Sequence, residues 1–203
     1  GAVGGEYPFK NSKVVGRVHV IVENTTFESE TLPTELKGKF INNWYDLTED
    51  DSMMTVILKA LEGKGYHWQG GADDYDISYL ASVEWDKTRL AEFTGGGNSG
   101  WMGTLNDWFV NQTFAGFTVK NGGLKSGDVI RVVFTTNLGE DVGSSWTNNE
   151  TTLSSLTFSS GELTPAYAKA TTDYLLVIPS EQVGTRINYS AANKNFQTRA
   201  YLN

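Results

Sequence analysis

The sequence predicts an α+β domain followed by a segment built only of strands and turns, and three observations lead to this prediction. Apolar residues alternate with period two over residues 17–23, five apolar residues recur on one helical face over 53–61, and strand patterns follow to the end of the chain. A strand pair, one helix and then further strands is an α+β order in which the helix covers one face of the sheet.

The first strand and the single helix carry the clearest patterns. Val18, Val20 and Val22 alternate with polar or mixed neighbours, so one face of that strand is expected to be buried. The helix is expected to start from a capping box over residues 48–51, in which Thr48 accepts from an early helical N–H and Asp51 reaches back. Its apolar face and its glycine stop are formed by Met53, Met54, Ile57, Leu58, Leu61, Gly63 and Gly65.

The remaining elements are expected to be strands. They are predicted over residues 77–85, 100–110, 116–120 and 128–135, with glycine-rich turns between them because glycine reaches positive φ angles. A stretch rich in Gly, Ser and Asn then marks a connection between domains. The predicted organisation is a first domain over 13–138, a linker over 139–150 and an all-β segment over 151–203.

Composition excludes several classes of function. The formal net charge is −8 and the isoelectric point about 4.8, so a phosphate backbone would be repelled and no nucleic acid is expected as a partner. There is no cysteine, which removes disulfides, thiolate nucleophiles and Cys-based zinc sites. No apolar run approaches the roughly 20 residues of a spanning helix, and no signal peptide is visible.

Two segments of the first domain carry a family resemblance. Residues 99–107, with Gly100-Trp101-Met102 and Asn106, and residues 127–134, with a Gly-Asp-Val strand entry, resemble the transcobalamin-like C-terminal domain family. The resemblance spans roughly residues 13–136 and implies a β-grasp-like sheet with one main helix. Members close over cobalamin in animal carriers, whereas many bacterial copies belong to large surface proteins. The family often has an aromatic residue where this chain has Gly103, so a ligand contact through that ring would be missing.

The C-terminal segment carries a second resemblance. Its Leu-x-x-Leu strand at 153–158, its Gly-x-Leu-x-Pro turn at 161–165 and its Tyr-containing strand at 172–179 are similar to the opening of the cadherin-like β-sandwich domain of bacterial surface proteins. The match covers about half of such a domain and implies a partial all-β sandwich. Strands only are expected here, with Leu156, Phe158 and Tyr174 facing inward.

Catalytic patterns are absent from the sequence, and we expect no enzyme activity, no cofactor and no metal. His19 and His67 are far apart and lack metal-ligand spacing, and Ser99 fails the nucleophile-elbow pattern. The acids at 49–51 suit helix capping. Those at Asp73, Asp74 and Asp76 suit a solvated loop, with a calcium site as the sharper alternative.

Aromatic and amide side chains are the remaining candidates for binding. Trp101 and Trp108 flank the predicted turn at Asn106, and Asn111 follows, so we expect any ligand-binding contacts at Trp101, Asn106, Trp108 and Asn111. Core packing is the competing interpretation for both tryptophans. Trp44, Tyr66 and Trp68 form a second possible aromatic surface on either side of the helix.

The two resemblances together imply a non-enzymatic binding or adhesion module of a modular, secreted or cell-wall-associated surface protein of a Gram-positive bacterium. Its expected partners are neighbouring domains of the same chain and an extracellular ligand, either a glycan or a host protein. Capture of a corrinoid, by likeness to the cobalamin carriers, and a purely structural spacer are the alternatives. This functional expectation rests on analogy of folds, not on the chemistry of a site.

Overall fold

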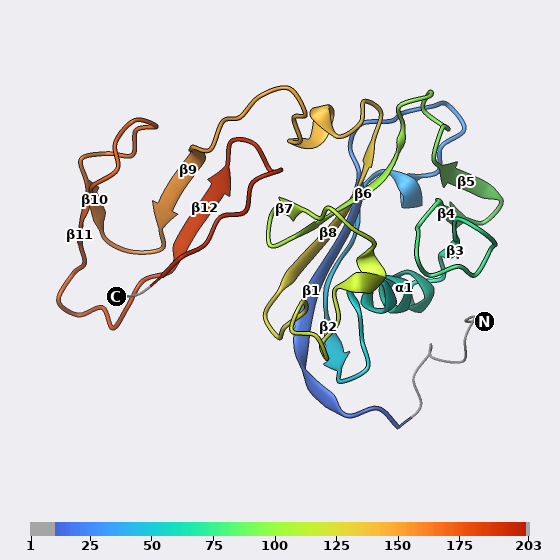
Figure 1. The fold of residues 1–203 in the computed structure, drawn as a ribbon, viewed down its shortest axis with the longest axis horizontal. Coiled ribbons are helices and arrows are strands. Elements are labelled where there is room, and N and C mark those ends of the chain that lie inside the picture. The colour runs from blue at the N-terminus through green and yellow to red at the C-terminus, as the bar shows by residue number, and fades with distance from the viewer. Residues whose placement is uncertain (1–10, 202–203) are drawn as a thin grey trace. The chain divides into compact units, whose positions relative to one another are not determined.

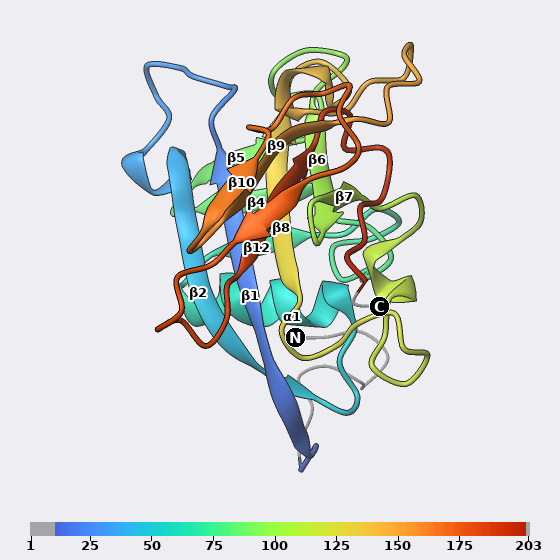
Figure 2. The same ribbon diagram turned by 90° about the vertical axis from the view of Figure 1, so that its left-hand side faces the viewer.

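The computed structural model describes residues 11–201, so the last two residues of the predicted C-terminal domain lie outside the described part. The chain divides into two compact units, and the boundary in the sequence lies between Val142 and Gly143. We call them unit 1 and unit 2 and describe each by itself. Figures 1 and 2 show the ribbon from two directions.

Unit 1 is organised around a five-stranded sheet with the strand order β2-β1-β8-β6-β7. The strands β1 and β8 run parallel in its middle, and every other neighbouring pair is antiparallel. In Figure 2 the helix α1 crosses behind β1, β2 and β8, so it covers one face of this sheet. The elements are β1 (Val14–Asn24), β2 (Gly38–Thr48), α1 (Met53–Gly63), β6 (Gly100–Leu105), β7 (Trp108–Phe109) and β8 (Val129–Thr135).

The core of unit 1 lies between the helix and the sheet, as the sequence pattern predicts. Val18, Val20 and Val22 of β1 are fully buried, and so is the predicted apolar face of α1. The strand β1 therefore turns alternate side chains toward the helix, which is the geometry of a pleated strand with one buried face. The predicted helix over 53–61 is confirmed.

The predicted capping box at 48–51 is wrong, because the N-cap of the helix lies one turn later. Its N-cap is Ser52, which forms a capping box with Thr55, whereas Thr48 is the last residue of β2. Asp51 does reach back to the Thr48 N–H, at 2.7 Å, but the Thr48 hydroxyl caps nothing. Its oxygen is buried and has no hydrogen-bond partner among residues 11–201.

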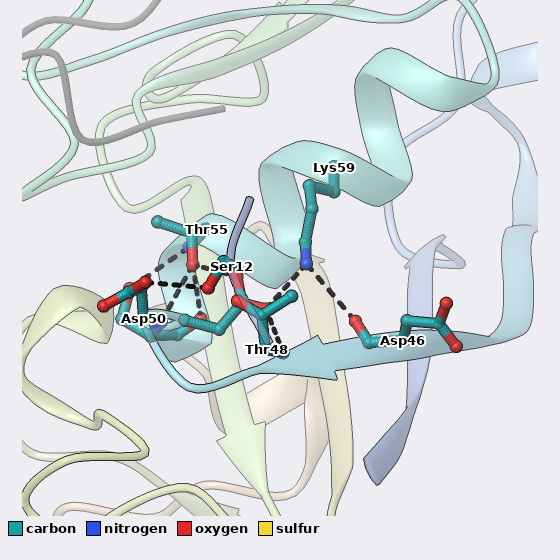
Figure 3. A network of polar contacts seen from close by, with 8 residues as sticks. Ser12, Asp46, Thr48, Asp50, Thr55 and Lys59 are labelled. Atoms are coloured by element: carbon teal, nitrogen blue, oxygen red, sulfur yellow. Dashed lines mark hydrogen bonds and ion pairs between the residues drawn. The ribbon is translucent and has the colours of Figure 1, made fainter. Parts of the chain in front are cut away.

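A buried carboxylate joins the start of α1 to the end of β2 (Figure 3). Asp51 has no exposed surface and accepts hydrogen bonds from the Thr55 hydroxyl at 2.7 Å and from the Lys59 ammonium at 2.6 Å. Lys59 also donates to the Asp46 carbonyl of β2 at 3.2 Å. Together with the Thr48 N–H, these donors give the Asp51 carboxylate three hydrogen bonds, as burial of a charged group requires.

A second, three-stranded sheet with the order β3-β4-β5 packs near the end of α1. It consists of β3 (His67–Gln69), β4 (Ser82–Trp85) and β5 (Thr88–Ala91). Trp68 and its cross-strand partner Val83 face the core, so His67 and its partner Glu84 face away from it. Short 3-10 turns complete unit 1 at η2 (Thr34–Leu36), η3 (Phe114–Gly116) and η4 (Glu140–Val142).

Asp141 ties η4 to the end of β8. Its carboxylate accepts from the Thr135 hydroxyl and from the Thr136 N–H at 2.8 Å and hydroxyl at 2.9 Å. Burial by itself would raise the pKa of this group, but the hydrogen bonds from the two threonines outweigh it and lower the pKa below the usual value of 3.8.

Unit 2 contains two separate two-stranded antiparallel sheets. One pairs β9 (Leu153–Phe158) with β12 (Ile187–Ala191), and the other pairs β10 (Glu162–Thr164) with β11 (Leu175–Val177). Between residues 143 and 201 only Ser144, Ala191 and Asn193 are buried. The predicted inward residues Leu156, Phe158 and Tyr174 are half-buried, so this unit has little apolar core.

The predicted α+β class, with a β-grasp-like sheet and a partial sandwich, is wrong, because the fold is mostly β. Of the described residues, 35% are in strands and 10% are helical, and the strands belong to several sheets. The sequence reading missed β2, β3 and β5. Most outward side chains of β2 are polar, which hides its alternation, and strands of three or four residues are too short to show a period. Conversely, residues 77–81 and 116–120 form turns and irregular structure.

Candidate functional site

Trp101, the first residue of the predicted site, belongs to the core. Its side chain is 5% exposed, and its ring packs edge-on against Phe134 at 5.2 Å between centroids. The indole N–H donates to the Leu90 carbonyl at 2.9 Å, so the polar end of the ring is satisfied inside the protein. Trp101 therefore fixes β6 against β5 and presents no surface to a ligand.

Asn106 occupies the predicted hairpin turn and holds it in place. Asn106 and Asp107 have φ angles of 50° and 66°, the left-handed pair that a two-residue turn between Leu105 and Trp108 requires. The Asn106 side chain accepts from the Val129 N–H at 2.9 Å and donates to the Asp128 carboxylate at 3.0 Å. Its amide is thus occupied in joining the turn to the start of β8.

Trp108 and Asn111 lie on the surface side of the same hairpin. Trp108 is half-buried on the edge strand β7 and meets Phe117 edge-on at 6.1 Å. Asn111 is exposed in the turn that follows β7. The four predicted residues do not converge on one site, since Trp101 is internal and Asn106 is structural.

Gly103 is explained by packing. A Cβ atom there would lie 2.6 Å from the ring of Phe114, and 3.1 Å from Met53. The ring of Phe114, on η3, occupies the space beside β6 where a side chain at position 103 would extend.

A polar groove of about 410 Å³ opens elsewhere in unit 1, beside β3. We call it the β3 groove. Its lining combines aromatic rings with carboxylate, amide and imidazole groups: Glu62, Tyr66, His67, Trp68, Gln69, Asp74, Tyr75 and Glu84. These residues come from the last turn of α1, from the connection between α1 and β3, from β3 and β4, and from the loop between the two strands.

The aromatic part of the β3 groove has a fixed base and an exposed wall. Tyr66 and Trp68 are 5% and 8% exposed, and the Tyr66 hydroxyl donates to the Glu35 carbonyl at 2.6 Å. Burial, aided by the nearby charge of Glu35, raises the Tyr66 pKa to about 12, so this phenol stays neutral. Tyr75 is 48% exposed and stands edge-on to Trp68 at 6.4 Å. Tyr75 is therefore the ring that a ligand can reach.

Two of the three carboxylates in the groove are held by hydrogen bonds. Glu62 accepts from the Trp68 indole N–H at 3.0 Å, and Glu84 accepts from Arg89 Nε at 2.7 Å. Asp74 is exposed in the loop and its backbone carbonyl accepts from the Gly70 N–H at 3.3 Å. The groove thus contains two carboxylates held in place, one exposed carboxylate and one exposed aromatic ring.

The loop over residues 70–78 depends on its own aspartates and on a glycine. Asp73 accepts from the Tyr75 N–H at 2.9 Å, and Asp76 accepts from the Ala72 N–H at 2.9 Å and from Ser78. A Cβ atom on Gly70 would lie 2.2 Å from the Asp76 carbonyl oxygen, so the loop closes only with glycine there.

These contacts give the predicted acidic loop a structural role. Within residues 11–201 no group of three or more His, Asp or Glu side chains is arranged to hold a metal ion. Asp73 and Asp76 turn their carboxylates to the loop backbone, while Asp74 faces the β3 groove. The calcium alternative therefore gains no support from the loop geometry.

Sequence reasoning named Tyr66, Trp68 and Asp74 of the groove lining but missed its exposed ring, Tyr75, and the two carboxylates Glu62 and Glu84. Tyr66 and Trp68 were singled out together with Trp44, which the structure places on β2 stacked against His19 at 5.1 Å, outside the groove lining. Glu62 and Glu84 meet only because β3 pairs with β4 beside the helix end, which no local pattern indicates.

Comparisons with known proteins give no family for the chain. No protein-family model matches the sequence, and no curated protein matches it. Of the helices in the described part of the chain, none has the length and apolar character needed to cross a membrane.

Proposed function

We propose that the chain is a non-enzymatic binding module of a bacterial surface protein and that it binds a glycan in the β3 groove. The observation that carries the proposal is the exposed ring of Tyr75 beside the polar side chains of Gln69, Asp74 and Glu84 in one groove of about 410 Å³. A sugar ring presents apolar C–H groups to an aromatic face and hydroxyls to its surroundings. Sites for small ligands commonly measure ~300–1,000 Å³ and fix orientation through a few polar groups.

The extracellular setting in this proposal rests on the resemblance of residues 13–136 and 151–203 to domains of bacterial surface proteins. Loop-borne binding on a rigid sheet is the usual arrangement of such modules, and the β3 groove follows it, since its exposed ring lies on a loop and its base on a sheet. A second site on the hairpin around Trp108 has less support, because its polar partner Asn106 is occupied.

The test is a glycan array probed with the whole chain and with Tyr75→Ala. We expect binding of the parent and its loss in the variant. Trp44→Ala is the matched control, since Trp44 is 46% exposed but lies outside the groove lining. Equal binding by Tyr75→Ala would overturn the site.

Two further measurements cover the alternatives. A bound oligosaccharide recovered intact after incubation supports a binding module, and cleavage products would contradict the non-enzymatic assignment. A spectroscopic corrinoid titration should be silent. Silence of both the array and the corrinoid titration would leave the chain as a structural spacer.

A further inference from the structure

The strand β2 forms an open edge of the five-stranded sheet of unit 1. It is the first strand in the order β2-β1-β8-β6-β7, so only one of its two sides is paired. Figure 2 shows it as the outer border of this sheet. A strand with one unpaired side presents a row of backbone N–H and C=O groups with which a strand of another chain can pair.

The hydrogen bonds of β1 identify the residues of β2 whose backbone groups point outward. The His19 N–H donates to the Asp128 carbonyl at 3.0 Å, on the side of β1 that faces β8. Trp44 lies opposite His19 in the antiparallel ladder, so this pair exchanges no backbone hydrogen bonds and the N–H and C=O of Trp44 point to the open edge. Because the direction alternates along a strand, the same holds for Asn42 and Asp46.

The middle of this edge is available for pairing. The carbonyls of Trp44 and Asp46 accept from side chains, from Arg17 at 3.4 Å and from Lys59 at 3.2 Å. Within residues 11–201 the outward N–H and C=O of Asn42 and the N–H of Trp44 have no hydrogen-bond partner. A carbonyl oxygen has two lone pairs, so the Trp44 carbonyl can accept a second bond.

The features that commonly protect an edge strand lie outside this stretch. The strand β2 contains no proline, and its ladder with β1 skips Phe40, which makes a bulge before Ile41. Over residues 41–47 the pairing with β1 is regular. Bulges and prolines prevent a second strand from pairing, so the outer edge of this regular run is able to receive one.

The side chains of β2 are complementary to a second copy of the same strand that runs in the opposite direction. Asn42, Asn43 and Trp44 are exposed. When two copies pair about Asn43, Asn42 of each lies opposite Trp44 of the other, and the two Asn43 side chains face each other. An amide both donates and accepts, so it is a suitable partner for its own copy.

The charges at the two ends of the strand add to this complementarity. Lys39 precedes the exposed middle of β2, Asp46 follows it, and both are exposed. Their partners on β1 are Glu23 and Arg17, which point to the sheet face away from the buried valines, so Lys39 and Asp46 share that face. In an antiparallel pair, Lys39 of each copy lies near Asp46 of the other, and opposite charges across a strand pair are stabilising.

We propose that two copies of the chain form a dimer by antiparallel pairing of β2 with β2, with the two-fold axis at Asn43. Asn42 of each copy exchanges both backbone hydrogen bonds with Trp44 of the other. Such a contact uses the same edge of both copies, so it closes at two chains. The contact is small, so we expect a weak dimer with a dissociation constant on the order of 100 μM.

The test is sedimentation equilibrium of the whole chain from about 10 to about 500 μM, a range that spans this constant. Asn42→Pro removes the outward N–H and is compatible with the folded monomer, because proline is tolerated on an edge strand where its missing N–H faces solvent. Asn42→Ala is the matched control, since it loses the same side chain, including its contact with His19, and keeps the N–H. We expect the parent and Asn42→Ala to dimerise and Asn42→Pro to dimerise at least about tenfold more weakly.

A charge exchange tests the direction and register of the pairing. Lys39→Asp brings like charges together at both ends of the contact and should weaken the dimer several-fold. Adding Asp46→Lys to this variant restores opposite charges with their positions exchanged, so the dimer should recover. Damage to the monomer fold by Lys39→Asp would not be repaired by the second substitution.

The outcomes are distinct from those of the glycan test. A parent chain that stays monomeric over the whole range would overturn the dimer. A dimer of Asn42→Pro as tight as that of the parent, or a charge exchange without recovery, would overturn the pairing through β2. None of the residues that line the β3 groove lies on β2, so these results do not depend on the proposed function.

Discussion

The buried carboxylate of Asp51 is the feature of unit 1 whose removal has the most definite consequence. Asp51 receives the Thr48 N–H, the Thr55 hydroxyl and the Lys59 ammonium, and so connects β2 to the first turn of α1. Asp51→Ala leaves these three donors without their acceptor. The matched control is Asp50→Asn, because Asp50 is the adjacent residue and pairs with Lys120 at the surface.

The magnitude follows from what each donor can do next. Asp51→Ala removes the acceptor that lies 2.7 Å from the Thr48 N–H, and leaving a buried donor unsatisfied costs ~1–3 kcal/mol. The Thr55 hydroxyl can keep its second bond to the Ser52 carbonyl, at 3.0 Å. The Lys59 side chain is 26% exposed and can turn to water, so the full penalty for breaking a buried ion pair does not apply. We expect unit 1 to lose about 2–4 kcal/mol of unfolding free energy.

The assay is urea unfolding followed by tryptophan fluorescence. Trp146 is the one tryptophan in unit 2, and the other five of the six lie in unit 1, so the signal reports mainly on the affected unit. The midpoint should fall clearly in Asp51→Ala, partly in Asp51→Asn and far less in Asp50→Asn. Equal midpoints for Asp51→Ala and Asp50→Asn would refute the assigned role of the buried carboxylate.

Four further predictions concern the unfolding of the chain or the local opening of its two units. Thr48→Val should leave the urea midpoint unchanged or raise it, because the hydroxyl it removes is buried without a partner; a large decrease would reveal an unseen bond. Gly103→Ala should lower the midpoint, since its methyl would lie within 2.6 Å of the Phe114 ring, and co-substitution of Phe114 by leucine should recover part of the loss. Because the Asp141 pKa is lowered in the folded state, its contribution is complete at neutral pH and disappears as the pH falls below about 3.8, so parent and Asp141→Asn should differ in stability at pH 7 and converge in acid. Backbone amides of unit 2 should exchange with solvent faster than those of β1 and β8, and equal protection in the two would contradict the small core of unit 2.

Long, regular patterns made part of the fold predictable. The alternation in β1 and the helical face of α1 extend over enough residues for their periods to be visible, and both are where the sequence indicates. The class was misjudged because β2 carries Asn42, Asn43 and Trp44 in the middle of its length, which conceals an 11-residue strand. Pairing with β1 holds β2 in the sheet, and a partner strand is not visible in a local pattern.

The site was less predictable than the fold, for a related reason. In the sequence, a buried tryptophan cannot be told from an exposed one that could stack on a ligand. Only the position of Trp101 in β6, where its indole N–H donates to the Leu90 carbonyl, shows that it is internal. The β3 groove depends on the meeting of a helix end, two short strands and a loop. Tyr66 and Trp68 could be selected as aromatic residues of interest, but Glu62 and Glu84 join them only through tertiary structure.

The most direct test of the central claim, that the β3 groove is the ligand site, is an NMR titration of the tryptophan indole N–H signals with a glycan that binds on the array. Trp68 donates its indole N–H to Glu62 at the groove, whereas Trp108 lies on the edge strand β7. We predict that the Trp68 signal shifts with saturation while the Trp108 signal stays in place. A shift of Trp108 with an unchanged Trp68 signal would contradict the account and place binding on the hairpin.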